Sequence, residues 1–242
     1  MRRALFGLTV LVVLLAGLRH SAFAVPVDLE LVLAVDVSYS VDADEARLQR
    51  EGYFAALRHP RVLQAVSSGP HRAIAVTYVE WAGSFYQRVV ADWTVLRDAA
   101  SIENFIARIA AVQQQPASRT SISGAIDFSA RLFDDNGYEG TRLVIDVSGD
   151  GRNNHGRPAR DARDAAVAKG ITINGLPILS GNENFGRPAE DGLEEHYREE
   201  VIGGPGAFVI PAESFANFTS AILSKLVREI AGTPTQLASP LP

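Results

Sequence analysis

The chain has 242 residues, a formal net charge of −5 and no cysteine, and its length suits one domain with a substantial core. The absence of cysteine excludes disulfides, thiolate metal sites, cysteine nucleophiles and a lipid-modified cysteine anchor. The acidic balance, without a basic stripe, argues against a nucleic-acid partner, because such a partner requires Lys and Arg contacts to phosphate.

The N-terminus has the pattern of a secretory signal peptide. Two arginines precede an apolar run over residues 4–18, and a small-x-small site follows at residues 22–24. The run is shorter than the ~20 residues that span a bilayer. We therefore predict cleavage after Ala24, which gives a signal peptide at 1–24 and a periplasmic or secreted mature protein with no stable membrane span. An uncleaved membrane anchor is the alternative.

The next part of the chain alternates apolar strands with a helix. Residues 29–35 form a nearly continuous apolar run, which predicts a strand covered on both faces. Helical spacing over residues 46–57 predicts a helix that Pro60 terminates. Two β-type runs, at 74–81 and 85–93, are separated by a short loop and predict a hairpin with one antiparallel strand.

Further elements continue this alternation. In chain order they are helices at 102–112 and 122–133, a strand at 143–147, a helix at 158–169, a strand at 171–178, a short helix at 193–201, a strand at 207–210 and a final helix at 215–230. The pattern predicts an α/β domain over residues 25–231, with a doubly wound, mostly parallel sheet and one antiparallel edge strand. A disordered, proline-containing tail is predicted over residues 232–242.

Three segments place oxygen-bearing side chains at the predicted carboxyl ends of strands, where ligands bind in such sheets. Asp36, Ser38 and Ser40 alternate after the first strand, so an extended backbone turns all three the same way. Thr120 opens a helix, and Asp150 follows a buried strand. Two carboxylates and three hydroxyls suit a hard cation such as Mg²⁺, and so few charges leave positions open for an outside ligand.

This set of residues resembles the metal-ion-dependent adhesion site (MIDAS) of von Willebrand factor A (VWA) domains. The resemblance covers nearly all of the predicted domain and implies a Rossmann-like VWA fold. It also implies that Ser38, Ser40 and Thr120 contact the metal directly or nearly so, while Asp36 and Asp150 bind it directly or through water. The implied cofactor is Mg²⁺, with Mn²⁺ or Ca²⁺ as alternatives, and an Asp or Glu of a protein partner completes the coordination.

Segments 78–83 and 148–151 also resemble an uncharacterised family of exported bacterial VWA-like proteins, a likeness that supports the fold and implies no activity. Two features depart from the MIDAS pattern. Ser118 and Arg119 precede the threonine where VWA domains often carry two glycines, which would place a cation beside the metal and weaken its binding. Asp146 lies in a predicted buried strand, where hydrogen bonding or pairing with an arginine is a better interpretation than an extra ligand.

Other polar and aromatic residues have structural interpretations. Trp81 and Trp93 are predicted to pack in the hairpin or the core. Residues 153–155 are more typical of a solvated, turn-forming loop than of a site lining. The acidic residues between 190 and 200 are more typical of a solvated helix face than of a second metal site.

These features predict a domain that is not an enzyme and that recognises proteins through a bound metal. A metal-dependent, phosphatase-like hydrolase is the first alternative, because Asp36 at a strand end and the later Asp150 also resemble haloacid-dehalogenase phosphatases. Such an enzyme needs an acid two residues after the nucleophile to protonate the leaving group, and that position is Ser38. The second alternative is a structural VWA domain without metal.

Overall fold

A mixed sheet lies at the centre of the fold. The computed structural model describes residues 24–41, 43–179, 190–213 and 215–232. Within them, five strands form a sheet in the order β4-β3-β2-β6-β7. Their bounds are Leu29–Asp36 (β2), Ile74–Trp81 (β3), Gln87–Leu96 (β4), Leu143–Gly149 (β6) and Ile171–Pro177 (β7). All neighbouring pairs are parallel except β3 with β4, which confirms the predicted fold class.

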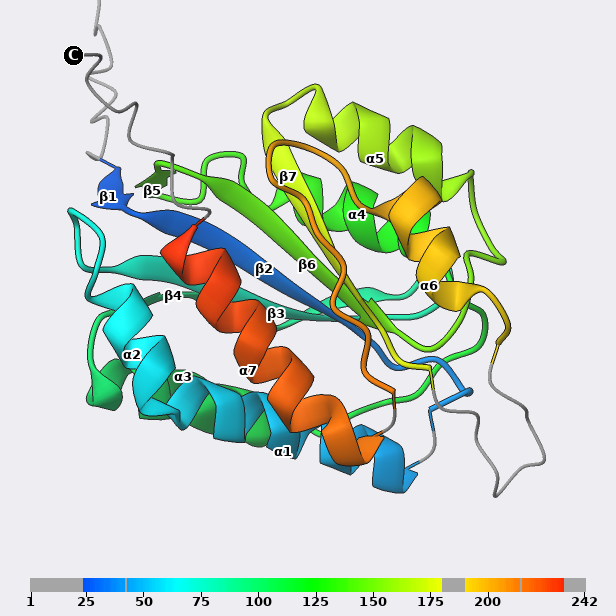
Figure 1. The fold of residues 1–242 in the computed structure, drawn as a ribbon, viewed down its shortest axis with the longest axis horizontal. Helices are drawn as coiled ribbons and strands as arrows, with labels where there is room; N and C mark the ends of the chain where they lie inside the picture. The colour runs from blue at the N-terminus through cyan, green and yellow to red at the C-terminus, as the bar shows by residue number, and fades with distance from the viewer. Residues whose placement is uncertain (1–23, 42, 180–189, 214, 233–242) are drawn as a thin grey trace, which may run out of the picture.

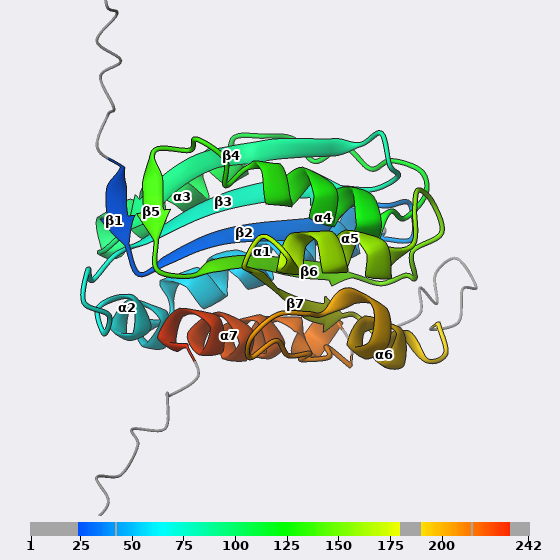
Figure 2. The same ribbon diagram turned by 90° about the horizontal axis from the view of Figure 1, so that it is seen from above.

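Helices cover both faces of this sheet (Figure 1 and Figure 2). One face carries α1 (Ala43–Arg58), α2 (Pro60–Val66), α3 (Ala99–Ala110) and α7 (Phe215–Ala231). The other carries α4 (Ile122–Arg131), α5 (Ala159–Val167) and α6 (Leu193–His196), which continues into a π-helical turn at Tyr197–Val201. Because both faces are covered, all eight residues of β2 are buried. Leu31 and Leu33 pack on one side and Val32 and Ala34 on the other.

Several element boundaries differ from the sequence predictions, and local contacts explain two of these differences. Pro60 ends α1 as predicted, but it also opens α2, since a proline in the first helical turn loses no hydrogen bond; the ring of His59 caps this end. β4 begins at Gln87, later than predicted, because the preceding residues form a turn closed by a hydrogen bond from the Tyr86 N–H to the Gly83 carbonyl oxygen.

Two short strands were not predicted from the sequence. β1 (Val25–Val27) and β5 (Tyr138–Gly140) form a separate parallel pair, and three-residue strands are too short to show a periodic pattern. Tyr138 packs against Trp93, with ring centroids 6.2 Å apart. Trp81 is fully buried, and Trp93 is half-buried on β4 against Phe133 and Tyr138, so both tryptophans pack in the core or the hairpin as predicted.

The strand predicted at 207–210 is wrong. The segment follows the edge of β7 but makes only isolated bridges, such as that between Val209 and Gly175. Gly204 and Gly206, which both have positive φ, turn the chain immediately before it. The apolar residues of this segment are therefore explained by packing against the sheet edge and not by a ladder of strand hydrogen bonds.

The predicted signal peptide and C-terminal tail lie almost wholly outside the described residues, so both stay predictions. None of the helices in the described ranges is long and apolar enough to cross a membrane.

The strand order creates a switch point at the carboxyl ends of β2 and β6. From β2 the chain moves to β3 and β4 on one side, and then crosses to β6 and β7 on the other. Because β2 and β6 are parallel neighbours, the residues that follow them share one edge of the sheet, opposite β1 and β5 (Figure 2). Asp36 ends β2 and Asp150 directly follows β6, so both lie where doubly wound folds bind ligands.

Candidate metal centre

The segment after β2 is extended as far as Ser38, where a turn begins that is closed by a hydrogen bond from the Val41 N–H to the Ser38 carbonyl oxygen over 3.0 Å. The extended backbone predicted for Asp36, Ser38 and Ser40 therefore ends at Ser38, and Ser40 lies in the turn. The Ser38 N–H donates to Asp36 Oδ1 over 2.8 Å. Ser38 also forms a β-bridge with Ala117, and the Tyr39 N–H donates to the Ala117 carbonyl oxygen over 3.0 Å. The loop that precedes α4 therefore supports the end of β2 as a short added strand would.

Hydrogen bonds connect this segment to the end of β6. Ser38 Oγ and Ser40 Oγ lie 2.8 Å apart, and Ser40 Oγ donates to Asp150 Oδ1 over 2.6 Å. Ser40 and Asp150 are 110 positions apart in the sequence, so only the fold brings them together. With Asp36, these residues form one polar cluster in the place where the sequence predicted it.

Thr120 reaches the same cluster from the start of α4. A Cβ placed on Gly151 would lie 3.5 Å from Thr120 Oγ1, so the Thr120 hydroxyl faces the residue next to Asp150. Thr120 itself is almost fully buried. The structure thus brings all five predicted site residues to one edge of the sheet. Hydrogen bonds join four of them to one another, and Thr120 joins the cluster through its closeness to Gly151.

Asn153 and Asn154 position the Thr120 segment. The Thr120 N–H donates to Asn154 Oδ1 over 2.9 Å, and the Ser123 N–H donates to Asn153 Oδ1 over 3.0 Å. The interpretation of these asparagines as a solvated turn therefore misses their role, which is to join the loop after β6 to the first turn of α4. The available signal was two amide side chains within four residues of Asp150, each able to accept an unpaired helix N–H.

Gly149 allows the Asp36 carboxylate to lie against the backbone of β6. A Cβ at Gly149 would lie 2.8 Å from Asp36 Oδ2 and 3.1 Å from Tyr197 Oη, so a larger residue would displace one of them. Tyr197 is fully buried in the π-helical turn, and its place beside the site was not predicted from the sequence. Burial, followed by the Asp36 and Asp150 charges, raises the pKa of Tyr197 well above its ordinary value. Its phenol therefore stays neutral beside the cluster.

Asp36 shows an unmet electrostatic requirement. Its side chain is fully buried, and Oδ2 has no hydrogen-bond partner among the described residues. Burial, and after it the Asp150 charge, raises the pKa of Asp36 well above its ordinary value, while hydrogen bonds from Ser38 oppose this shift. A divalent cation held by both carboxylates would stabilise their charged forms. The residues present therefore fit a hard cation.

Within the described ranges, His, Asp and Glu side chains do not gather in groups of three that could hold a metal ion. The candidate centre has two carboxylates, so the hydroxyls of Ser38, Ser40 and Thr120 would have to supply the other protein ligands. Three of the acidic residues between 190 and 200 form ion pairs, which are Glu190 with Arg152, Glu194 with Arg198 and Glu200 with Arg160.

Arg119 lies at the rim of the cluster in a left-handed backbone conformation, with φ of 72°. This conformation is unfavourable for a residue with a Cβ, which explains why glycine would suit the position. The Arg119 side chain is exposed and makes no hydrogen bond or ion pair with the described residues.

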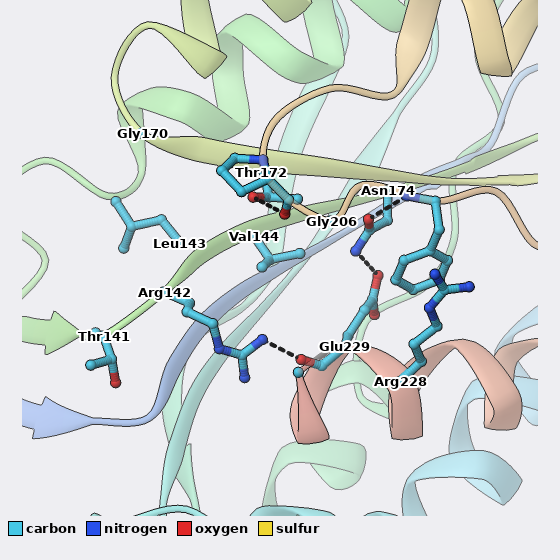
Figure 3. A pocket seen from close by; sticks show the side chains of 14 residues that line it. Thr141, Arg142, Leu143, Val144, Gly170, Thr172, Asn174, Gly206, Arg228 and Glu229 are labelled. Atoms are coloured by element: carbon cyan, nitrogen blue, oxygen red, sulfur yellow. Dashed lines mark hydrogen bonds between the residues drawn. The ribbon is translucent and has the colours of Figure 1, made fainter. Parts of the chain in front are cut away.

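Asp146 is paired inside the fold, but with a lysine and not with an arginine. Lys225 Nζ lies 2.5 Å from both Asp146 Oδ1 and Glu229 Oε1, and all three side chains are fully buried. Asn174 Nδ2 donates to Glu229 Oε1 over 2.9 Å. Figure 3 shows Glu229 and Asn174 facing each other beside a cavity of about 730 Å³, with Arg142 bonded to the end of α7. This polar region is separate from the candidate metal centre.

Several solved structures share this fold. Proximal thread matrix protein 1 from the mussel byssus, in a structure with a zinc occupied MIDAS motif, has a TM-score of 0.57 and 17% identity over 84% of this chain and 45% of its own. The pilus adhesin SpaC from Lactobacillus rhamnosus GG has a TM-score of 0.59 and 14% identity over 86% of this chain and 31% of its own. A von Willebrand factor type A protein from Catenulispora acidiphila has a TM-score of 0.55 and 12% identity over 84% and 43%.

These likenesses show a fold of the VWA type, and the chain spans less than half the length of each of the three proteins. The chain belongs to the family described as "Protein of unknown function (DUF1194)", whose model matches residues 26–234. No curated protein matches its sequence. The matched range contains the whole candidate metal centre.

Proposed function

We propose that this chain is an exported VWA-like domain that binds a divalent cation and recognises a protein through it. The observation that carries the proposal is the cluster of Asp36, Ser38, Ser40, Thr120 and Asp150, in which the buried Asp36 Oδ2 has no hydrogen-bond partner among the described residues. In this proposal the hydroxyls are direct ligands, and the aspartates bind directly or through water.

The chemistry of the donors favours Mg²⁺, with Mn²⁺ or Ca²⁺ as alternatives. All donors are oxygen atoms, and Mg²⁺ is commonly bound by one or two carboxylates while it keeps several waters. A neighbour of the same fold whose structure has a zinc occupied MIDAS motif supports a divalent cation at this edge of the sheet. The bound ion would supply an open position to an Asp or Glu carboxylate of the partner.

Recognition is favoured over catalysis because of the residue at position 38. A phosphatase that used Asp36 as its nucleophile would need an acid there to protonate the leaving group, and Ser38 instead bonds to Ser40. Export is supported by the N-terminal pattern of arginines, apolar run and small-x-small site. We therefore place the mature protein in the periplasm or outside the cell.

Metal titration separates this function from its two alternatives. We expect Mg²⁺ or Mn²⁺ to raise the melting temperature of the purified protein and a chelator to reverse the effect. Asp150→Ala should stay folded and lose this response, and Thr120→Ala should weaken it less. An unchanged melting temperature with every divalent ion tested would support the structural domain without metal. Metal-dependent hydrolysis of p-nitrophenyl phosphate that Asp36→Asn abolishes would support the hydrolase.

A further inference from the structure

We propose that Phe85 and Arg119 form a recognition surface beside the candidate metal centre. In this proposal the partner presents a bulky apolar side chain to Phe85 and a second acidic side chain to Arg119, next to the carboxylate that binds the metal. The inference rests on the proposed function and specifies the residues that flank the partner's metal-binding carboxylate.

Phe85 is an aromatic residue that almost nothing covers. Its side chain is 95% exposed at the tip of the β3–β4 turn. The turn is closed by the hydrogen bond from Tyr86 N–H to the Gly83 carbonyl oxygen over 2.9 Å, and the Ser84 N–H donates to His155 Nδ1 over 3.0 Å. The ring of Phe85 meets the ring of His155 edge-on, with centroids 5.8 Å apart. The backbone of the turn is therefore fixed by hydrogen bonds, and the ring of Phe85 stays accessible to a partner.

This ring lies close to the candidate metal centre. The His155 N–H donates to the Thr120 carbonyl oxygen over 3.1 Å, so a single residue separates Phe85 from a proposed metal ligand. Tyr39, which lies between the two site serines, is also 62% exposed. Of the four exposed large hydrophobic residues in the described ranges, Phe85 and Tyr39 adjoin the centre, while Val25 lies on β1 at the opposite end of the sheet.

Arg119 is placed on the segment that touches the Phe85 turn. A Cβ at Gly83 would lie 2.8 Å from the Ser118 carbonyl oxygen and 3.2 Å from Arg119 Cβ, and the Ser121 N–H donates to the Ala82 carbonyl oxygen over 2.8 Å. The hairpin turn and the Arg119 segment are therefore in contact.

Charge complementarity defines the partner. Arg152 and Arg157, on the loop after β6, are paired with Glu190 and Asp127, whereas Arg119 has no ion pair within the described residues. A divalent cation would neutralise the two site carboxylates and leave the charge of Arg119 available to a second acidic group. Aromatic and arginine side chains are enriched at protein interfaces, where a few such contacts supply most of the binding energy. The occupant that fits is an acidic protein segment with a bulky apolar residue.

Fluorescent synthetic peptides test this assignment. In each peptide a glutamate is flanked, in every order, by phenylalanine and a second glutamate, and matched peptides carry serine or glutamine at those flanking positions. Binding to the purified protein is measured by fluorescence polarisation with Mg²⁺ and with a chelator. We expect the serine and glutamine replacements each to weaken Mg²⁺-dependent binding about tenfold, a typical loss for a contact at the centre of an interface.

Two variants assign each preference to a residue. Phe85→Ser should remove only the preference for phenylalanine, and Arg119→Ser should remove only the preference for the second glutamate. Each combination of protein variant and peptide replacement is a double-mutant cycle that isolates one pairwise contact. Val25→Ser and Arg97→Ser are the matched controls, since both residues are exposed. Val25 lies on β1, and Arg97 follows the end of β4 that pairs with the start of β3, away from the centre. Both controls should bind as the wild type does.

The metal response keeps the two proposals distinguishable. All four variants should retain the thermal stabilisation by Mg²⁺, which shows that the fold and the metal centre are intact. If the wild type responds to Mg²⁺ but binds no peptide, or binds all of them equally, the recognition surface is overturned and metal binding stands. The recognition surface is also overturned if Phe85→Ser and Arg119→Ser both bind the peptides as the controls do. A wild type that does not respond to Mg²⁺ would overturn the proposed function and the recognition surface together.

Discussion

Thr120 and Asn154 are joined by two reciprocal hydrogen bonds. The Thr120 N–H donates to Asn154 Oδ1, and the Asn154 N–H donates to the Thr120 carbonyl oxygen, both over 2.9 Å. The pair crosses from the loop after β6 to the residue before the N-cap of α4. This pair of hydrogen bonds therefore sets the position of the Thr120 hydroxyl relative to Asp150, although Asn154 is not a proposed metal ligand.

Asn154→Ala should weaken the metal centre although it removes no proposed ligand. The variant leaves the nearly buried Thr120 N–H without its acceptor, which should lower the free energy of unfolding by about 1–3 kcal/mol. Because positioning residues of this kind tune metal sites, Mg²⁺ affinity should fall about 10–100-fold. Asn217→Ala, at an exposed position on α7, should change neither quantity. Isothermal titration with Mg²⁺ and urea unfolding measure both, and a wild-type affinity in Asn154→Ala would contradict the positioning role.

Glu229 gives the stability of the protein a dependence on pH. Burial, followed by the Asp146 charge, raises the pKa of Glu229 from 4.5 to about 7. Since the folded state holds the proton more tightly than the unfolded state, this group stabilises the fold fully below its unfolded pKa. That contribution is lost as the pH rises through about 7. Burial also raises the pKa of Asp146, which acts in the same direction.

We therefore expect the free energy of unfolding, measured with a chelator present, to fall by up to a few kcal/mol between about pH 5 and about pH 8. Glu229→Gln should reduce this slope, because the amide does not titrate and can still accept a hydrogen bond. Glu139→Gln, at an exposed position on β5, should keep the wild-type slope. Equal slopes in all three proteins would show that Glu229 does not exchange a proton on folding.

Lys225→Met should be strongly destabilising. Lys225 lies between Asp146 and Glu229 with no exposure to solvent, so the variant leaves two buried carboxylates without their cation. Breaking such a buried pair typically costs about 3–5 kcal/mol. Lys169→Met is the matched control, because its ion pair with Asp134 is exposed and 4.0 Å long, and it should cost almost nothing. Adding Asp146→Asn and Glu229→Gln to Lys225→Met should recover part of the loss, which urea unfolding would show.

The sheet and the candidate ligands were predictable because their signals are local. A strand buried on both faces is mostly apolar, as in β2 and β3, and the polar residues that follow such strands stand out. Asp36, Ser38 and Ser40 lie within five residues at the end of β2, so their proximity follows from the local sequence. The alternation of side chains predicted for all three holds only to Ser38, because a turn begins there.

The contacts that complete the site depend on how distant elements align, and no local pattern specifies them. Lys225, and not an arginine, meets Asp146 because of where α7 lies over β6. Tyr197 reaches Gly149 from the π-helical turn that continues α6. Asn154 has a composition typical of turns, and only its partner Thr120 reveals its role.

We expect Asp150→Asn to be at least as stable as the wild type without metal, and less stable than the wild type with Mg²⁺. Without metal, the wild type holds two carboxylates together, and the Asp150 charge contributes to the raised pKa of the buried Asp36. The asparagine removes that repulsion while its side-chain oxygen can still accept the hydrogen bond from Ser40. In a chelator the variant should therefore be at least as stable as the wild type. With Mg²⁺ at about 100 times its dissociation constant, the wild type should gain about 2.7 kcal/mol, and the variant should gain little.

Asp92→Asn makes the same change of charge at an exposed position on β4 and should follow the wild type in both conditions. Urea unfolding in the two buffers gives the four differences. The electrostatic account of this centre is wrong if Asp150→Asn is less stable than the wild type in the chelator and gains as much from Mg²⁺.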